Sequence, residues 1–205
     1  MIGRGKDAAE LLGLVVLLGA YVGFQGSLAG RPFFVVPACL ALGGYAVLLV
    51  RRGRAALREA GLRLDNLGPA SRLTACYAVP MAVVLLGVHA ATGRPWPPPR
   101  FYALALLYPL WGVAQQLLFQ GILHVRLRRL GLGRWSVLLT ALAFAGVHWP
   151  SGKLVLVALI GGLGFAYSFA VHPNVLPIGV AHGILGAMVY YLLLGQDVLE
   201  RFWAG

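Results

Sequence analysis

Seven long runs of apolar residues alternate with short polar segments along the chain. The runs lie at residues 9–29, 33–50, 72–92, 101–125, 135–149, 154–171 and 174–194. Most approach the roughly 20 residues that a helix needs to cross the hydrocarbon core of a bilayer. Lipid offers no hydrogen bonds to an irregular backbone, so we expect helices throughout. The pattern predicts an all-α, polytopic transmembrane bundle of about seven helices, forming one integral membrane domain over residues 1–205.

The composition supports a membrane location and changes the meaning of the charge. Hydrophobic residues make up 60% of the chain and charged residues 11%, against about 25% charged residues in soluble domains. The net charge of +11 would suggest a nucleic-acid partner in a soluble protein. Here the cations lie between the apolar runs, as topology determinants and contacts with anionic lipids do. We therefore expect membrane lipids as partners and no nucleic acid.

The distribution of Lys and Arg predicts the orientation of the helices. If every run crosses the membrane, 12 cations fall on the side of the N-terminus and 5 on the opposite side. The positive-inside rule then places the N-terminus in the cytoplasm and the C-terminus outside. We predict a multi-pass protein of the bacterial cytoplasmic (inner) membrane.

Polar side chains inside apolar runs are costly in lipid, so they indicate structural hydrogen bonds or a functional site. They are Gln25, His89, Gln115, Gln116, Gln120, His124, His148 and His182. Gln116, Gln120 and His124 follow i, i+4, i+8 spacing on one helix face, and Gln115 lies about 100° round from Gln116. His124 lies near the cytoplasmic end of its helix, so we expect it at the membrane interface rather than in a site.

Three of these polar positions, on three helices, are predicted to lie at similar depth. Gln115, His148 and His182 are about 16, 21 and 12 Å from the cytoplasmic ends of their helices, at the 1.5 Å rise of an α-helix. In one middle layer they could converge on a water-accessible cavity. The alternative interpretation is interhelical hydrogen bonding alone, which single Gln and His side chains provide in membrane bundles.

Three motifs around these residues resemble those of the CAAX-protease and bacteriocin-processing (Abi) family of intramembrane endopeptidases. That family carries E-E-x-x-x-R, usually followed by Gly, then F-x-x-x-H and H-x-x-x-N on successive helices. The first motif here reads Q-Q-L-L-F-Q from Gln115 to Gln120, with Gly121 after it. The second is intact from Phe144 to His148.

The third motif keeps its first residue, His182, and has Gly186 where the family has Asn. Asn174, ahead of this motif, also resembles family sequences. The resemblance covers about residues 100–195, which form the family-like core. It assigns catalytic positions to Gln115, Gln116, His148 and His182. It assigns supporting positions to Gln120, Gly121, Phe144 and Asn174.

The resemblance implies a protease mechanism that these residues alter. In the family, the first Glu and the His of the second motif activate a water, and the later His and Asn stabilise the oxyanion. A carboxamide cannot accept a proton at neutral pH, and it is a poor metal ligand beside His and carboxylate. We therefore assign no metal ligands, leave the cofactor open, and expect water activation at Gln115 to fail. If only the two Glu of the family motif were replaced, its Arg would remain as an unpaired buried charge. Three neutral amides avoid that cost.

Three functions follow as hypotheses. An endopeptidase with altered chemistry would use His148 as general base and His182, with Gln115, as oxyanion donors. A pseudoprotease would bind a transmembrane, leader or lipidated peptide without cutting it, in bacteriocin immunity, assembly or chaperoning. A transporter would use the Gln/His layer as a polar pathway, although the absence of intramembrane acids and of an inverted repeat disfavours it. Cleavage of a peptide, or its absence, separates the first two.

Overall fold

The computed structural model describes residues 2–24 and 32–197, so Gln25 lies outside the described part. The chain forms helices in this order: α1 (Ile2–Phe24), α2 (Pro32–Arg52), α3 (Arg54–Glu59), α4 (Leu67–Ala91), α5 (Arg100–Gln116), the π-helix η1 (Leu117–His124), α6 (Val125–Arg129), α7 (Trp135–Gly146), α8 (Gly152–Val171), α9 (Val175–Met188) and the π-helix η2 (Val189–Leu193). No strand occurs within the two described ranges.

Each of the seven apolar runs coincides with a helical segment, because α5, η1 and α6 form one continuous helix and α9 continues into η2. Among the described residues, four segments are long and apolar enough to cross a membrane, namely Leu67–Ala91, Arg100–Arg129, Gly152–Val171 and Val175–Leu193. Leu11–Gly23 and Trp135–Gly146 are apolar but shorter. The predicted all-α, polytopic helical bundle is confirmed.

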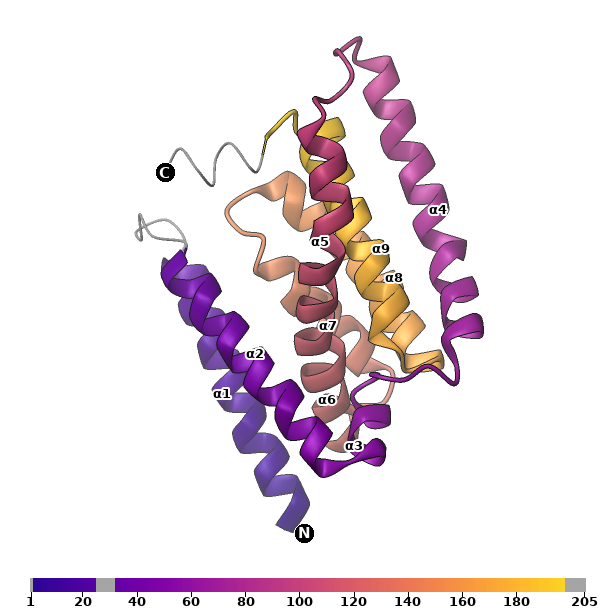
Figure 1. Ribbon diagram of the computed structural model, residues 1–205. Helices are drawn as coiled ribbons and strands as arrows, with labels where there is room; N and C mark the ends of the chain where they lie inside the picture. The colour runs from indigo at the N-terminus through magenta and orange to yellow at the C-terminus, as the bar shows by residue number, and fades with distance from the viewer. Residues whose placement is uncertain (1, 25–31, 198–205) are drawn as a thin grey trace.

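The helices pack as a bundle in which α5 lies against α9 and α7 against α8 (Figure 1). Helix α4 covers α9, α8 and η2 from the right-hand side of that view. Helices α1 and α2 occupy the left-hand side, where α1 contacts α6 and α2 contacts α3. The residues of the predicted family-like core therefore form the centre of the molecule.

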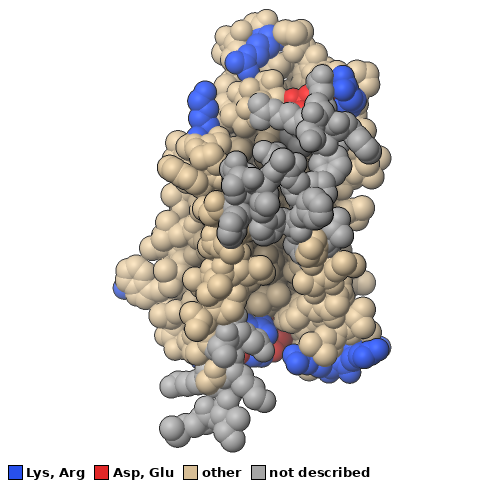
Figure 2. All heavy atoms as spheres, turned by 90° about the vertical axis from the view of Figure 1, so that its left-hand side faces the viewer, with Lys and Arg blue, Asp and Glu red and all other residues tan. Residues whose placement is uncertain are grey.

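Polar segments that the charge pattern assigns to one side of the membrane meet at one end of the bundle. Arg129 at the end of α6 pairs with Asp7 on α1 and with Glu59 on α3. At the opposite end Arg100, which begins α5, pairs with Asp197 after η2. Most of the Lys and Arg visible in Figure 2 lie toward the two ends, with uncharged surface between them. Successive loops therefore lie at alternate ends of the bundle, as predicted. Which end faces the cytoplasm stays a prediction.

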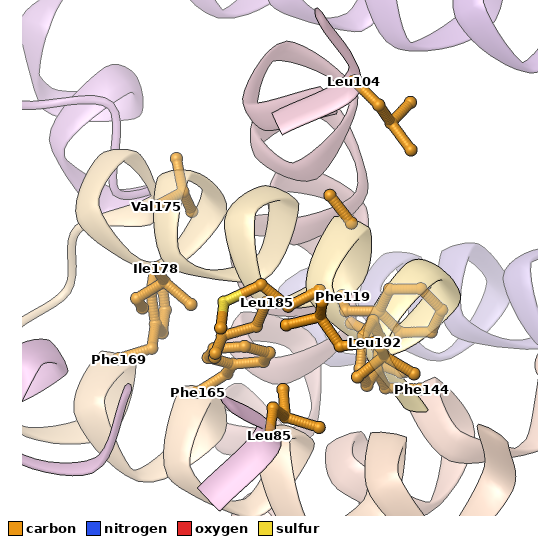
Figure 3. Close-up of a cluster of buried hydrophobic side chains, with 14 of the residues drawn as sticks. Leu85, Leu104, Phe119, Phe144, Phe165, Phe169, Val175, Ile178, Leu185 and Leu192 are labelled. Atoms are coloured by element: carbon orange, nitrogen blue, oxygen red, sulfur yellow. The ribbon is translucent and has the colours of Figure 1, made fainter. Parts of the chain in front are cut away.

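Aromatic and aliphatic side chains from most of the helices meet in one core cluster (Figure 3). The rings of Phe119 on η1 and Phe144 on α7 lie edge to face, 5.2 Å between centroids. Large apolar residues are also exposed outside, such as Leu106 at 77% and Leu110 at 73% on α5. Such exposure is costly in water and favourable against lipid tails, so the outer surface fits a bilayer.

Candidate functional site

The helix that carries the three glutamines changes its geometry where they occur. α5 ends at Gln116, and a π-helix follows from Leu117 to His124. Gly121 allows the α3 turn to approach this widened segment, because a Cβ there would lie 2.7 Å from the Ala60 carbonyl oxygen. π-Helical turns are rare and are frequently found at functional sites. Gly121 thus has a packing role beside the site.

A chain of hydrogen bonds runs from η1 across α5 to α9. Gln120 Nε2 donates to Gln116 Oε1 over 3.2 Å. Gln116 Nε2 lies 3.2 Å from His182 Nδ1, and all three side chains are buried. In this arrangement the Gln116 amide donates to Nδ1, so the neutral His182 ring carries its proton on Nε2. The backbone of Gly112 on α5 interacts with the same ring.

His148 follows the last turn of α7 and is oriented by its own helix. Its Nδ1 lies 2.7 Å from the Phe144 carbonyl oxygen. A carbonyl can only accept, so Nδ1 carries the proton and Nε2 of the neutral ring keeps a lone pair. The Phe144 ring makes T-shaped contacts with both histidine rings, and its centroid lies 5.0 Å from the centroid of each. Phe144 therefore packs against both His148 and His182.

Both histidines line a cavity between α4, α5, α7, α8 and α9. The cavity measures about 50 Å³, enough for roughly three to five waters. Its walls are mainly apolar, and Met81, Val157, Phe165 and Leu185 are among them. A small cavity with apolar walls and two histidine rings can hold an apolar side chain, water, or a polar group that reaches His148.

The third motif forms the other wall of the cavity. A Cβ at Gly183 would lie 2.4 Å from Pro109 Cα, so glycine lets α9 cross α5 in close contact. At Gly186, where the family motif has Asn, a Cβ would lie 2.8 Å from the edge of the Tyr108 ring. The Tyr108 ring thus approaches the site where the family motif carries an amide side chain.

The structure brings some of the predicted site residues together and separates others. Gln116 contacts His182, while Gln115 is half-buried and its Oε1 has no hydrogen-bond partner in the described part of the chain. Asn174 caps the N-terminus of α9 by accepting from Leu176 N at 3.0 Å. Its Nδ2 donates to the Arg63 carbonyl at 2.8 Å, so Asn174 ties the loop after α3 to α9, away from the cavity.

His124 is buried inside the bundle and lies outside the cavity of His148 and His182, whereas its depth relative to the membrane interface stays a prediction. Its side chain has an exposure of 0%, and its ring packs against Phe169 on α8. Nε2 lies 3.4 Å from Ser136 Oγ and Nδ1 lies 3.4 Å from Thr140 Oγ1, both on α7. Two hydroxyls can satisfy both ring nitrogens, which lets a neutral histidine be buried there.

Tyr108 is a cavity residue that the sequence reasoning missed. It lies eight residues before Gln116 on α5, with Gly112 halfway between, so all three share one helix face. That spacing was a usable signal, although an aromatic residue in an apolar run attracts no attention by itself. Among the described residues, no group of three His, Cys, Asp or Glu side chains could hold a metal ion.

Comparison with known proteins identifies a family for the region that contains the cavity. Residues 96–188 match the family model described as Type II CAAX prenyl endopeptidase Rce1-like. No curated protein and no solved structure matches the chain. The matched region begins in the Pro-rich turn before α5 and ends with α9, so it includes Gln116, Phe144, His148 and His182.

Proposed function

Because residues 96–188 match the Rce1-like family model of type II CAAX prenyl endopeptidases, we propose that this chain is a non-catalytic member of that family that binds a membrane-embedded or lipidated peptide segment. The family assignment supports an intramembrane protease-like protein. The binding of a segment without hydrolysis, in the bacterial inner membrane, is our inference from the site.

The observation that carries this proposal is the amide chain from Gln120 through Gln116 to His182. Amide side chains are neutral and cannot take a proton from water at neutral pH. Buried charges are costly unless they are paired, so three neutral amides suit a dry site that is maintained without an anion. This arrangement supports recognition rather than water activation.

The cavity walls indicate what kind of segment fits. Apolar residues from α4, α8 and α9 surround it, and its volume of about 50 Å³ suits a small apolar side chain or the end of an acyl or prenyl chain. His148 offers one lone pair, on Nε2, to a donor of the bound segment. One polar contact in an apolar pocket fixes orientation, which is how small binding sites obtain specificity.

A second candidate function rests on the same lone pair. A slow endopeptidase could use His148 Nε2 to take a proton from a water whose oxygen attacks the scissile carbonyl carbon. The proton would then pass to the leaving nitrogen as the C–N bond breaks. His148 has no carboxylate partner among the described residues to stabilise its imidazolium form, and such partners raise rates by orders of magnitude.

Peptide termini in the native host test these two functions. Membranes would be compared by mass spectrometry between wild type, a deletion, His148→Ala, and the triple variant Gln115→Glu, Gln116→Glu, Gln120→Arg. We expect no termini that depend on the wild-type protein, and new termini with the triple variant. Termini that need the wild type and vanish with His148→Ala would instead establish the endopeptidase.

Photocrosslinking tests binding itself. A benzophenone amino acid would replace Ala158, which lines the cavity, or Leu156 on the same helix, which is 60% exposed. We expect one discrete peptide segment to be captured from position 158 and lost in His148→Ala, while position 156 captures lipid. Equal capture at both positions, or no peptide at position 158, would reject the binding function.

A further inference from the structure

A second, larger cavity lies at the end of the bundle that holds the predicted cytoplasmic loops. It measures about 310 Å³ and is separate from the residues around His148 and His182. We call it the basic cavity, and its lining residues are Arg58, Glu59, Arg63, Val125, Arg128, Arg129, Phe169 and Pro173. We propose that the basic cavity binds the phosphate headgroup of an anionic phospholipid.

The lining combines an apolar base with a cationic rim. Val125 and Phe169 are buried, whereas Arg58, Arg128 and Arg129 are exposed. A phospholipid has the same division, with a charged phosphate next to the apolar start of its chains. The volume of the cavity also fits a headgroup, because about 310 Å³ corresponds to roughly 20–30 waters on the scale used for the first cavity. The cavity therefore suits a bulky amphiphilic headgroup better than a single small ion.

The ion pairs show which arginines of the basic cavity are already paired with carboxylates and which can still bind an anionic ligand. Arg129 pairs with both Asp7 and Glu59. Arg63 donates to Asp65 through Nε at 2.7 Å and through Nη2. This bond holds the pKa of Asp65 below its usual value, so Asp65 stays anionic and keeps Arg63 engaged. These two arginines are largely neutralised by their partners.

Arg58 and Arg128 are less engaged. The shortest ion pair of Arg58 is 3.7 Å long, to Asp65. Arg128 Nη1 donates to the Ala170 carbonyl at 3.3 Å, and within the described ranges Arg128 makes no ion pair with a carboxylate. A guanidinium forms paired hydrogen bonds to phosphate oxygens that match its fork. Arg58 and Arg128 are thus the groups that bind the phosphate.

The position of the cavity selects a lipid as the source of that phosphate. The helix from Arg100 to Arg129 has 30 residues, or about 45 Å, which exceeds the ~30 Å of the hydrocarbon core. Arg128 and Arg129 therefore reach the headgroup layer. Pro173 lies just before the N-terminus of α9, whose dipole also favours an anion. Basic pockets between helices at this level bind anionic headgroups.

Native mass spectrometry of the purified full-length protein tests the proposal. Dioleoyl phosphatidylglycerol and dioleoyl phosphatidylcholine would be titrated into detergent-solubilised wild type, Arg58→Gln/Arg128→Gln, and the control Arg72→Gln/Arg134→Gln. The control removes two exposed cations at the same end, outside the cavity. We expect the first double variant to bind phosphatidylglycerol about tenfold more weakly, as lost charged hydrogen bonds predict, and the control to bind it like wild type.

Three outcomes would overturn the proposal. Equal weakening in both double variants would mean diffuse electrostatic attraction. Equal binding of the two lipids by the wild type would mean that the phosphate charge is not recognised. Displacement of phosphatidylglycerol by millimolar inorganic phosphate would mean a site for a free anion. Conversely, Glu59→Gln removes the anion of the rim, so we expect tighter binding of phosphatidylglycerol, and weaker binding would contradict the proposal.

Discussion

Gln116 on α5 and His182 on α9 are joined side chain to side chain, with Gln116 Nε2 3.2 Å from His182 Nδ1. The two residues are 66 positions apart, and the helices that carry them pack against each other extensively. Gln120 adds the next bond of the same chain. The amides at the motif positions are therefore part of the packing that sets the orientation of His182.

Replacement of Gln116 by Leu should destabilise the protein. The change leaves His182 Nδ1 and Gln120 Nε2 without their partners in a buried site, which costs about 1–3 kcal/mol. Unfolding in mixed micelles with increasing SDS measures this loss. Gln115→Leu is the matched control, because Gln115 Oε1 already lacks a partner among the described residues, so that variant should be neutral or more stable. Equal effects of the two variants would contradict the assigned roles.

The close crossing of α5 and α9 makes a second prediction. Gly183→Ala should lower the free energy of unfolding by about 1–3 kcal/mol or more, as overpacking does, because the new Cβ would meet Pro109 backbone atoms at 2.4 Å. Gly87→Ala on α4 is the control. Nothing lies within 4 Å of a Cβ there, and Ala has the higher helix propensity, so the control should be stabilising. A neutral Gly183→Ala would mean that the helices cross less closely.

The helices and the residues of the two histidine motifs could be predicted because lipid makes hydropathy the dominant signal. Long apolar runs must be helical in a bilayer, and the few polar positions within them are conspicuous. The similar depth of His148 and His182 followed from counting residues. These two residues do line one cavity, and both contact the Phe144 ring.

The details that failed depend on helix register and on short side chains. Hydropathy does not distinguish an α-helix from the π-helix that begins at Leu117, so the 3.6-residue period used to align His124 with Gln116 does not apply to that segment. Ser136 and Thr140 attract no attention in an apolar run, yet their hydroxyls bury His124. Which of two adjacent glutamines meets His182 depends on the rotation of α5, and no periodicity fixes that.

Asn174 should matter for stability through the loop that it holds. Asn174→Ala removes the cap of α9 and two bonds from Nδ2, to the Arg63 carbonyl and to Asn66 Oδ1. We expect a loss of about 1–3 kcal/mol and faster hydrogen exchange in residues 61–66. Asn174→Asp keeps the acceptor for Leu176 N and should recover part of the loss. If Asp and Ala behave alike, the cap contributes nothing.

Removal of His124 should mainly lower stability, whereas removal of His148 should mainly reduce peptide binding. His124→Ala takes away a ring that packs on Phe169 and bonds two hydroxyls, so it should cost about 2 kcal/mol or more of stability. Peptide capture from the cavity should persist at temperatures where that variant stays folded. His148→Ala should lower the unfolding midpoint less than His124→Ala does, because the hydrogen bonds of its side chain within the described residues go to the backbone of its own helix, but it should reduce capture at position 158 several-fold. Unfolding in SDS and crosslinking yield, measured on both variants, test these two expectations.

If His124→Ala abolished capture in the folded protein and His148→Ala did not, the binding site would lie toward the basic end of the bundle rather than at the cavity beside Phe144.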